Sequence, residues 1–184
     1  MTSTQETEFA NSAMPINWYE VAKLLHENAT QLHAAPQGTV VRSVNGKTYA
    51  RSTSNRSVFL LAAFALENLI KAFLVYENPH YIENGKISGA LRSHKLSNLQ
   101  KKCRKIPSPK RTLHVFETLE DGVNSWARYP CSLSIDQETE ERIVTPAFWS
   151  EYNRVFELYG ERLEVLLAKN WKGPFGERSS VKFE

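Results

Sequence analysis

Residues 56–76 read RSVFLLAAFALENLIKAFLVY, and this stretch decides the fold of the chain. Drawn as a helix, it is apolar on nearly every side, which is typical of a helix enclosed by neighbouring elements. The run 58–66 is entirely apolar, but Glu67, Asn68 and Lys71 then fall near the middle of the stretch. Each charge at the centre of a membrane helix costs about 2.5–3.5 kcal/mol, so two charges and an amide argue against a membrane span. We therefore predict the buried central helix of a soluble protein.

The whole chain has the size and composition of one globular domain. It has 184 residues, of which 41% are hydrophobic and 23% charged, so it can bury a core. Its eight glycines and eight prolines exclude collagen-like and low-complexity sequences. Cys103 and Cys131 are too few for a disulfide scaffold and lack the spacing of a metal site. The polar N-terminal residues are unlike a secretion signal, and we expect a cytoplasmic protein with reduced thiols.

Upstream of the central stretch, the sequence predicts a tail, a helix and a β-hairpin. Residues 1–14 are expected to form a disordered tail, after which Asn17 caps a helix that ends before Pro36. Residues 39–52 contain valines and a tyrosine on either side of Asn45-Gly46, the dipeptide favoured in a type I′ turn. We expect this hairpin excursion to pack on the helices, because an isolated hairpin is only marginally stable.

Downstream, the sequence predicts three more helices and a flexible C-terminal tail over 173–184. Ser93 is positioned to cap a short helix, and prolines bracket a longer one within 109–130. Thr145-Pro146 is a cap followed by proline and opens a long helix that ends near Asn170. The predicted fold of residues 15–172 is all-α: an antiparallel up-and-down bundle of about five helices, with one small β-hairpin inserted between helices 1 and 2.

Charged residues are strongly segregated along the chain, although the net charge is only +3. No acidic residue lies between Glu83 and Glu117, and that segment holds nine basic ones: Lys86, Arg92, Lys95, Lys101, Lys102, Arg104, Lys105, Lys110 and Arg111. Residues 117–151 hold eight acidic residues against two basic ones. The basic run is either a surface for the phosphates of a nucleic acid or nucleotide, or a solvated face that pairs with the acidic segment within the fold or in a partner copy.

Several catalytic and metal-binding motifs are missing. Gly46-Lys47-Thr48 resembles the end of a phosphate-binding P-loop, but Val41 stands where the earlier glycine is required. The histidines have no i, i+4 pair accompanied by a carboxylate, which argues against a zinc site. Neither serine nor cysteine occurs in a nucleophile-elbow context. We therefore predict no metal, no cofactor and no enzyme of these classes.

The polar residues of the central stretch need partners. Glu67 and Lys71 are four residues apart, with the glutamate on the N-terminal side, which is the favourable order for a helical ion pair. An unpaired charge in the interior is very costly, so further polar groups are expected beside them. The sequence offers His94, at the start of the short helix, and Arg128, at the end of the longer one.

The segments that carry these residues resemble motifs of the HEPN (higher eukaryotes and prokaryotes nucleotide-binding) domain family. The segments are ALENLIKA at 65–72, SHKLSNL at 93–99 and RYP at 128–130, and a long final helix follows them, as in that family. The resemblance covers roughly residues 18–170. It implies a helical bundle that forms a homodimer and binds nucleotide or RNA. It also implies a prokaryotic stress, defence or toxin–antitoxin system, with a nucleotidyltransferase or an antitoxin as partner.

Many HEPN proteins are ribonucleases that use an arginine and a histidine with four to six residues between them. Here one residue separates Arg92 from His94, and two separate Arg111 from His114. The ribonuclease motif is therefore missing, and the chain is more similar to the non-catalytic members, which are binding modules. No catalytic residue is predicted.

The predicted ligand-binding residues are Glu67, Lys71, His94, Lys95, Arg128 and Tyr129. Lys71, His94 and Arg128 are expected to converge on a phosphate, with Arg128 forming two parallel hydrogen bonds to it and His94 in the first turn of its helix. Three alternatives stay open: a buried network that only fixes the bundle register, a degenerate ribonuclease whose arginine and histidine come from separate segments, for example Arg128 and His94, and a protein-interaction or dimerisation module without a small ligand.

Overall fold

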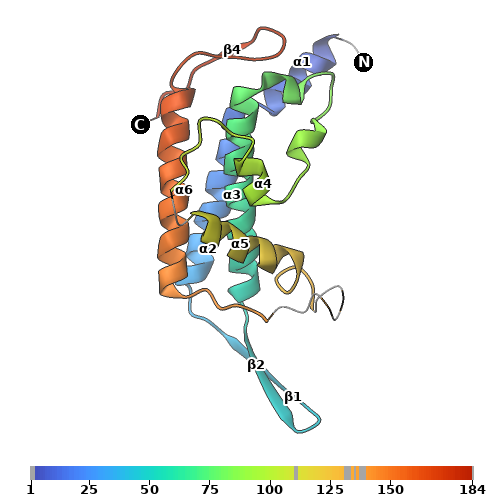
Figure 1. Cartoon of the computed structure of the whole chain (residues 1–184), viewed down its shortest axis with the longest axis vertical. Coiled ribbons are helices and arrows are strands. Elements are labelled where there is room, and N and C mark those ends of the chain that lie inside the picture. Colours follow the sequence, from blue (N-terminus) through green and yellow to red (C-terminus); the bar gives the residue numbers. More distant parts are fainter. Residues whose placement is uncertain (1–2, 110–111, 131–133, 135, 137–139, 184) are drawn as a thin grey trace.

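The computed structural model describes residues 3–109, 112–130, 134, 136 and 140–183. Helix α3 (Asn55–Glu77) is its central element and runs along most of the helical body (Figure 1). Its Phe59, Leu66 and Phe73 are fully buried. Within the described part of the chain, α3 alone is long and apolar enough to cross a membrane, and 78% of its most apolar window is buried inside the fold. That burial is typical of the core helix of a soluble protein, as predicted.

Helices on both sides enclose α3. Helix α2 (Pro15–Ala34) packs along one side of it, and the short α4 (Leu96–Gln100) and α5 (Thr112–Asn124) lie on the other (Figure 1). Helix α6 (Pro146–Leu167) lies beside both α2 and α3. Two 3₁₀ turns, Pro79–Ile82 and Gly89–Leu91, connect α3 to α4. The molecule is therefore mainly helical, with side chains from all these elements in one core.

Contacts at both ends of α6 show that it runs parallel to α3. Near their N-terminal ends, the rings of Phe59 and Phe148 stack with centroids 5.5 Å apart. Near their C-terminal ends, Trp171 Nε1 donates a hydrogen bond to the carbonyl of Tyr76 at 3.3 Å. The start of α6 is the predicted one, because the Thr145 hydroxyl accepts a hydrogen bond from the Phe148 N–H.

Two helix boundaries differ from the prediction. Helix α2 begins at Pro15, and the predicted cap, Asn17, lies inside it and donates to the carbonyl of Asn11. Pro15 needs no N–H partner at a first helical position, so it starts the helix earlier than Asn17. Helix α5 ends at Asn124, earlier than the predicted end at Pro130, and a turn follows it.

The predicted hairpin is present, but its predicted packing is wrong. Strands β1 (Thr39–Val44) and β2 (Lys47–Ser52) pair antiparallel around Asn45 and Gly46, which have φ angles of 51° and 75°. Every residue of the two strands is exposed except Ser52, which is half-buried. The hairpin projects from the end of the helical body and does not lie on it (Figure 1). Its own ladder and the hydrogen bond from Thr53 N–H to the Gly38 carbonyl hold it in place.

Both predicted tails contain regular structure. Residues Ser3–Ser12 form helix α1, and Ala10 and Ala13 are buried against the core, so the expected disordered tail over 1–14 is wrong for this part. At the other end, β3 (Trp171–Lys172) pairs with β4 (Arg178–Ser179), and Phe183 meets the ring of Tyr19 edge to face. The local composition of these two segments predicts no regular structure, but tertiary contacts made by their few apolar residues order them.

The thiol of Cys103 is expected to be chemically inert in the folded protein. Burial, and to a lesser degree the charge of Glu77, raise its pKa to about 12. Because only the thiolate is a good nucleophile, iodoacetamide at pH 8 should alkylate Cys103 more than about a hundredfold more slowly in the folded chain than in urea. Peptide mass spectrometry measures both rates, and similar rates would contradict the prediction. Cys131 lies outside the described residues.

Candidate functional site

A buried ion pair lies at the middle of α3. Lys71 Nζ is 2.6 Å from Glu67 Oε1, and both side chains are 7% exposed. The i, i+4 spacing places the two groups on one side of the helix, as the sequence predicts. His94 completes the cluster from another element, with Nδ1 3.1 Å from each carboxylate oxygen of Glu67. His94 is 58% exposed, so this cluster meets solvent through its imidazole.

Trp18, from α2, covers the cluster. Lys71 Nζ lies 5.6 Å from the centre of the Trp18 ring, a distance at which an ammonium is attracted to the aromatic face. The indole N–H of Trp18 donates to the Ala13 carbonyl at 3.0 Å, which fixes the ring. A groove of about 260 Å³ lies beside the ring, between α1, α2, Asn68 and Ile87. The sequence gives no local signal for this role, because Trp18 reads only as part of a helical apolar stripe.

Arg128 and Tyr129 do not join the cluster. The carbonyl of Tyr129 accepts a hydrogen bond from Arg56 Nη1 at 2.8 Å, at the N-terminal end of α3. Arg56 precedes Glu67 by three helical turns, which is about 16 Å along the axis. The expectation that Lys71, His94 and Arg128 converge on one phosphate is therefore wrong. The pairing of Arg128 with His94, given as an example for the ribonuclease alternative, is not observed either.

His94 also lies outside its predicted position in a first helical turn. Helix α4 begins only at Leu96, after a turn in which Ser93 Oγ accepts from the Lys95 N–H. Lys95 is exposed beside His94. The free N–H groups of the α4 terminus are partly used, since the Ser97 N–H donates to the carboxylate of Glu120 at 2.7 Å. The observed arrangement makes Glu67, Lys71 and Trp18 a support that holds His94 at the surface.

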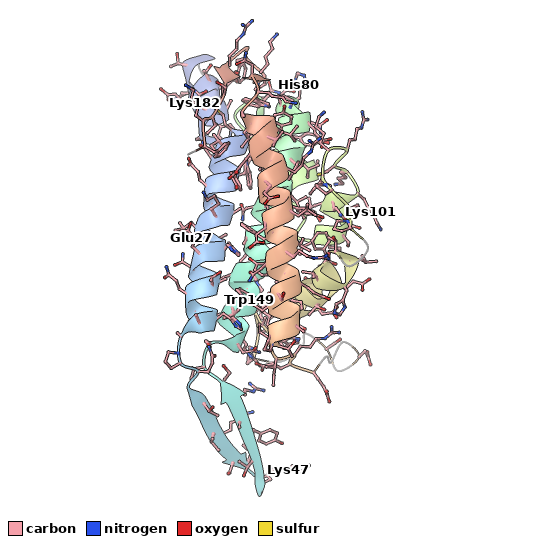
Figure 2. All side chains as sticks on the ribbon, turned by 90° about the vertical axis from the view of Figure 1, so that its left-hand side faces the viewer. Glu27, Lys47, His80, Lys101, Trp149 and Lys182 are labelled. Atoms are coloured by element: carbon pink, nitrogen blue, oxygen red, sulfur yellow. The ribbon has the colours of Figure 1, made fainter. Side chains whose placement is uncertain are left out.

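The segment that follows α3 forms a surface that we call the basic surface. It comprises seven exposed side chains: Lys86, Arg92, Lys95, Lys101, Lys102, Arg104 and Lys105. Its backbone is held to the end of α3, because the Glu77 carboxylate accepts hydrogen bonds from the N–H groups of Arg104 and Lys105 at 2.9–3.0 Å. Figure 2 shows Lys101 on the side of the molecule opposite to Glu27 of α2.

The ion pairs described for the acidic segment do not involve the basic surface. Glu141 forms its ion pairs with Arg56, at 2.8 Å, and Arg51, at 3.8 Å. Asp121 pairs with Arg142 at 3.0 Å. No ion pair in the described part of the chain joins the basic surface to a carboxylate. The alternative that the two segments pair inside one chain is therefore not observed there.

Two polar grooves lie within the basic surface. One, of about 360 Å³, is bordered by Glu77, Tyr81, Lys102, Arg104 and Lys105. The other, of about 330 Å³, is formed by the loop 80–92, with Lys86 and Arg92 in its wall. The described residues contain no group of three His, Cys, Asp or Glu side chains arranged to hold a metal ion. The basic surface thus offers positive charge and hydrogen-bond donors.

Comparison with known proteins gives no relative: no family model, curated protein or solved structure matches the chain.

Proposed function

We propose that this chain is a non-catalytic HEPN-like module that binds the phosphates of RNA or of a nucleotide on the basic surface. One observation carries the proposal: seven basic side chains of one segment are exposed, while the described ion pairs of the acidic segment, those of Asp121 and Glu141, are made with arginines outside that surface. Glu77 and Glu83 border its grooves, but the seven basic side chains outnumber them and form no ion pair with a described carboxylate. Such an excess of positive charge attracts polyanions through their phosphates. The antiparallel up-and-down bundle expected for that family is part of the same proposal.

The chemistry of the patch suits phosphates in two ways. Arg92 and Arg104 present planar guanidinium groups, which bind phosphate oxygens through paired hydrogen bonds, whereas the lysines supply point charges. His94, at the edge of the patch beside Lys95, adds a further hydrogen-bonding group that the Glu67 carboxylate orients. Lys71 has no direct part in this proposal, because its ammonium is buried against Glu67.

The non-catalytic part of the proposal follows from the arginine and histidine positions. The ribonuclease spacing is missing in the sequence, and Arg128 lies about three helical turns of α3 away from the His94 cluster. We place the module in the cytoplasm, where RNA and nucleotides are present. The homodimer and a nucleotidyltransferase or antitoxin partner, which the resemblance implies, stay predictions.

Removing charge from the basic surface should weaken RNA binding. In fluorescence anisotropy with a labelled 20-nucleotide RNA, Lys101→Ala combined with Lys105→Ala should make the slope of log K against log salt shallower by about 1.4, the contribution of two phosphate contacts to a single strand. Lys23→Ala with Lys169→Ala is the matched control, since it removes the same charge from exposed residues outside the basic surface. ATP as competitor tests whether a mononucleotide binds at the same place.

Equal binding by the two double variants would overturn the basic surface as the site. A wild-type protein that binds neither the RNA nor ATP at 50 mM salt would overturn the proposed function as a whole.

A further inference from the structure

No other described element of the chain packs on the strands of the β1–β2 hairpin. Its strands are exposed over their length, and Figure 2 shows Lys47 at the tip, far from the helical body. Large apolar side chains are exposed on it: Val40, Val41, Val44 and Tyr49. A two-stranded ribbon of this kind is marginally stable alone, so these side chains mark a surface for a partner.

The two faces of the ribbon differ in charge. Directly paired residues lie on the same face, so the pairs Arg42↔Tyr49, Val44↔Lys47 and Val40↔Arg51 share one face. We call this the basic face of the hairpin. The opposite face contains no charged residue, and its Ser43 and Thr48 hydroxyls lie 3.3 Å apart.

The basic face has almost no negative charge near it. No acidic residue lies between Glu27 and Glu67 in the sequence. Arg51, at the base of the ribbon, is 3.8 Å from Glu141, but Arg42 and Lys47 form no ion pair with any described residue. Tyr49 is exposed, and the Arg42 guanidinium lies 5.6 Å from the centre of its ring. Cations interleaved with an exposed aromatic ring are the combination that binds single-stranded nucleic acids.

We propose that the basic face of the hairpin binds single-stranded nucleic acid, with Tyr49 stacking on a base and Arg42 and Lys47 contacting phosphates. We favour this ligand because a polyanion supplies the negative charge that the described residues lack near Arg42 and Lys47, and because the exposed Tyr49 ring can stack on an unpaired base. A double-stranded RNA is a poorer fit, since its major groove is too deep and narrow for side chains to reach its bases.

The inference rests on the proposed function and narrows its ligand to a polymer. The hairpin precedes the first residue of α3, whereas the basic surface lies along its second half, from Lys95, next to the His94 that contacts Glu67, to Arg104 and Lys105 at Glu77. Glu67 lies about 18 Å along the helix axis from Asn55, and the hairpin extends away from that end, so no mononucleotide reaches both places. A single strand that contacts the hairpin and the basic surface follows the length of the helical body.

The test uses the full chain and labelled 20-nucleotide single strands of RNA and DNA. Arg42→Ala with Lys47→Ala should lower the affinity about 20-fold at 0.1 M salt and make the salt slope shallower by about 1.4. Tyr49→Leu should weaken binding by at least about 5-fold, whereas Tyr49→Phe, which keeps the ring, should bind like the wild type. Comparing the affinities for the RNA and DNA strands shows which of the two nucleic acids the hairpin binds.

A variant that lacks the hairpin provides a second test of the proposal. Residues 40–51 are replaced by two glycines, which is feasible because Thr39 and Ser52 are directly paired. Ser52 is kept because its hydroxyl accepts hydrogen bonds from the N–H groups of Ser54 and Asn55 at the start of α3. The midpoint of thermal unfolding should change little, because the strands pack on no helix, while strand binding should fall as in the double variant.

Three results separate the two proposals. If Lys101→Ala with Lys105→Ala weakens strand binding and the hairpin variants do not, the hairpin inference is wrong and the basic surface stands. If only the hairpin variants weaken it, the hairpin stands and the basic surface is wrong. If light scattering shows a wild-type dimer that becomes a monomer without the hairpin, and strand binding is unchanged, the ribbon pairs with a second copy of the chain and the inference is overturned.

Discussion

Lys71→Met is expected to lower the free energy of unfolding by about 3–5 kcal/mol, because it leaves a buried carboxylate without its cation. The Glu67 side chain is only 7% exposed, and Lys71 Nζ lies 2.6 Å from one of its oxygens. Methionine has a similar length and fills the space beneath Trp18, so the loss reports the charge and not a cavity. Urea unfolding followed by circular dichroism measures it.

The double variant Glu67→Leu with Lys71→Met serves as the counterpart. It removes both charges at once, and a buried ion pair replaced by apolar side chains is commonly neutral or stabilising. We therefore expect it to recover most of the stability that Lys71→Met loses. Lys169→Met, at an exposed position, should change the free energy of unfolding by no more than about 0.5 kcal/mol. A loss below about 1 kcal/mol for Lys71→Met would show that the carboxylate gains another partner.

The same two variants also distinguish a structural role of the Glu67–Lys71 pair from a role in ligand binding. If Glu67, Lys71 and Trp18 only support the fold and orient His94, the double variant keeps most RNA affinity on the basic surface. If Lys71 binds phosphate directly, affinity falls even though the fold is stable. The observed burial of Lys71 favours the first result.

The parts of the fold that the sequence predicts well depend on local signals. Residues 56–76 are apolar on nearly every side, and most of α3 is buried, with Leu60, Leu61 and Phe64 partly exposed. Asn45-Gly46 supplies two residues that tolerate positive φ, and Thr145-Pro146 supplies a hydroxyl and a preset φ at a helix start. In each case a few neighbouring residues decide the conformation without help from the rest of the chain.

The parts that it predicts poorly depend on distant contacts. Helix α1 is held by its burial against the core, and the position of Trp18 over Lys71 requires α2 and α3 to be packed in register. For the candidate site, the i, i+4 spacing predicts the Glu67–Lys71 ion pair. The need of these buried charges for further polar partners correctly predicts that His94 contacts Glu67. The predicted position of Arg128 beside Lys71 is wrong, because the order of helices in the sequence does not determine which part of α3 the end of α5 contacts.

The second large effect is expected at Asn55, where Asn55→Asp should lower the free energy of unfolding by about 3 kcal/mol. Asn55 begins α3, is 6% exposed, and binds the returning segment 141–144. Its Nδ2 donates to the Arg142 carbonyl at 2.8 Å and to Glu141 Oε1 at 3.2 Å, and its Oδ1 accepts from the Val144 N–H at 3.0 Å. Aspartate can still accept from Val144, but it cannot donate, and it places a second carboxylate against Glu141.

The comparison of Asp with Ala at this position tests the added charge, because Asp keeps the acceptor for the Val144 N–H and a larger loss for Asp must then come from its carboxylate. Burial alone would raise the pKa of Glu141, but hydrogen bonds from Arg56 and Asn55 hold it below its usual range, so Glu141 is ionised at neutral pH. Asn55→Ala loses both donated hydrogen bonds and also the one accepted from the Val144 N–H, but it adds no charge, and it should cost about 2 kcal/mol, less than Asn55→Asp. Asn28→Ala, at an exposed position of α2, should cost no more than about 0.5 kcal/mol. If urea unfolding ranks Asn55→Asp as stable as the wild type, the donated hydrogen bonds do not hold segment 141–144 to α3.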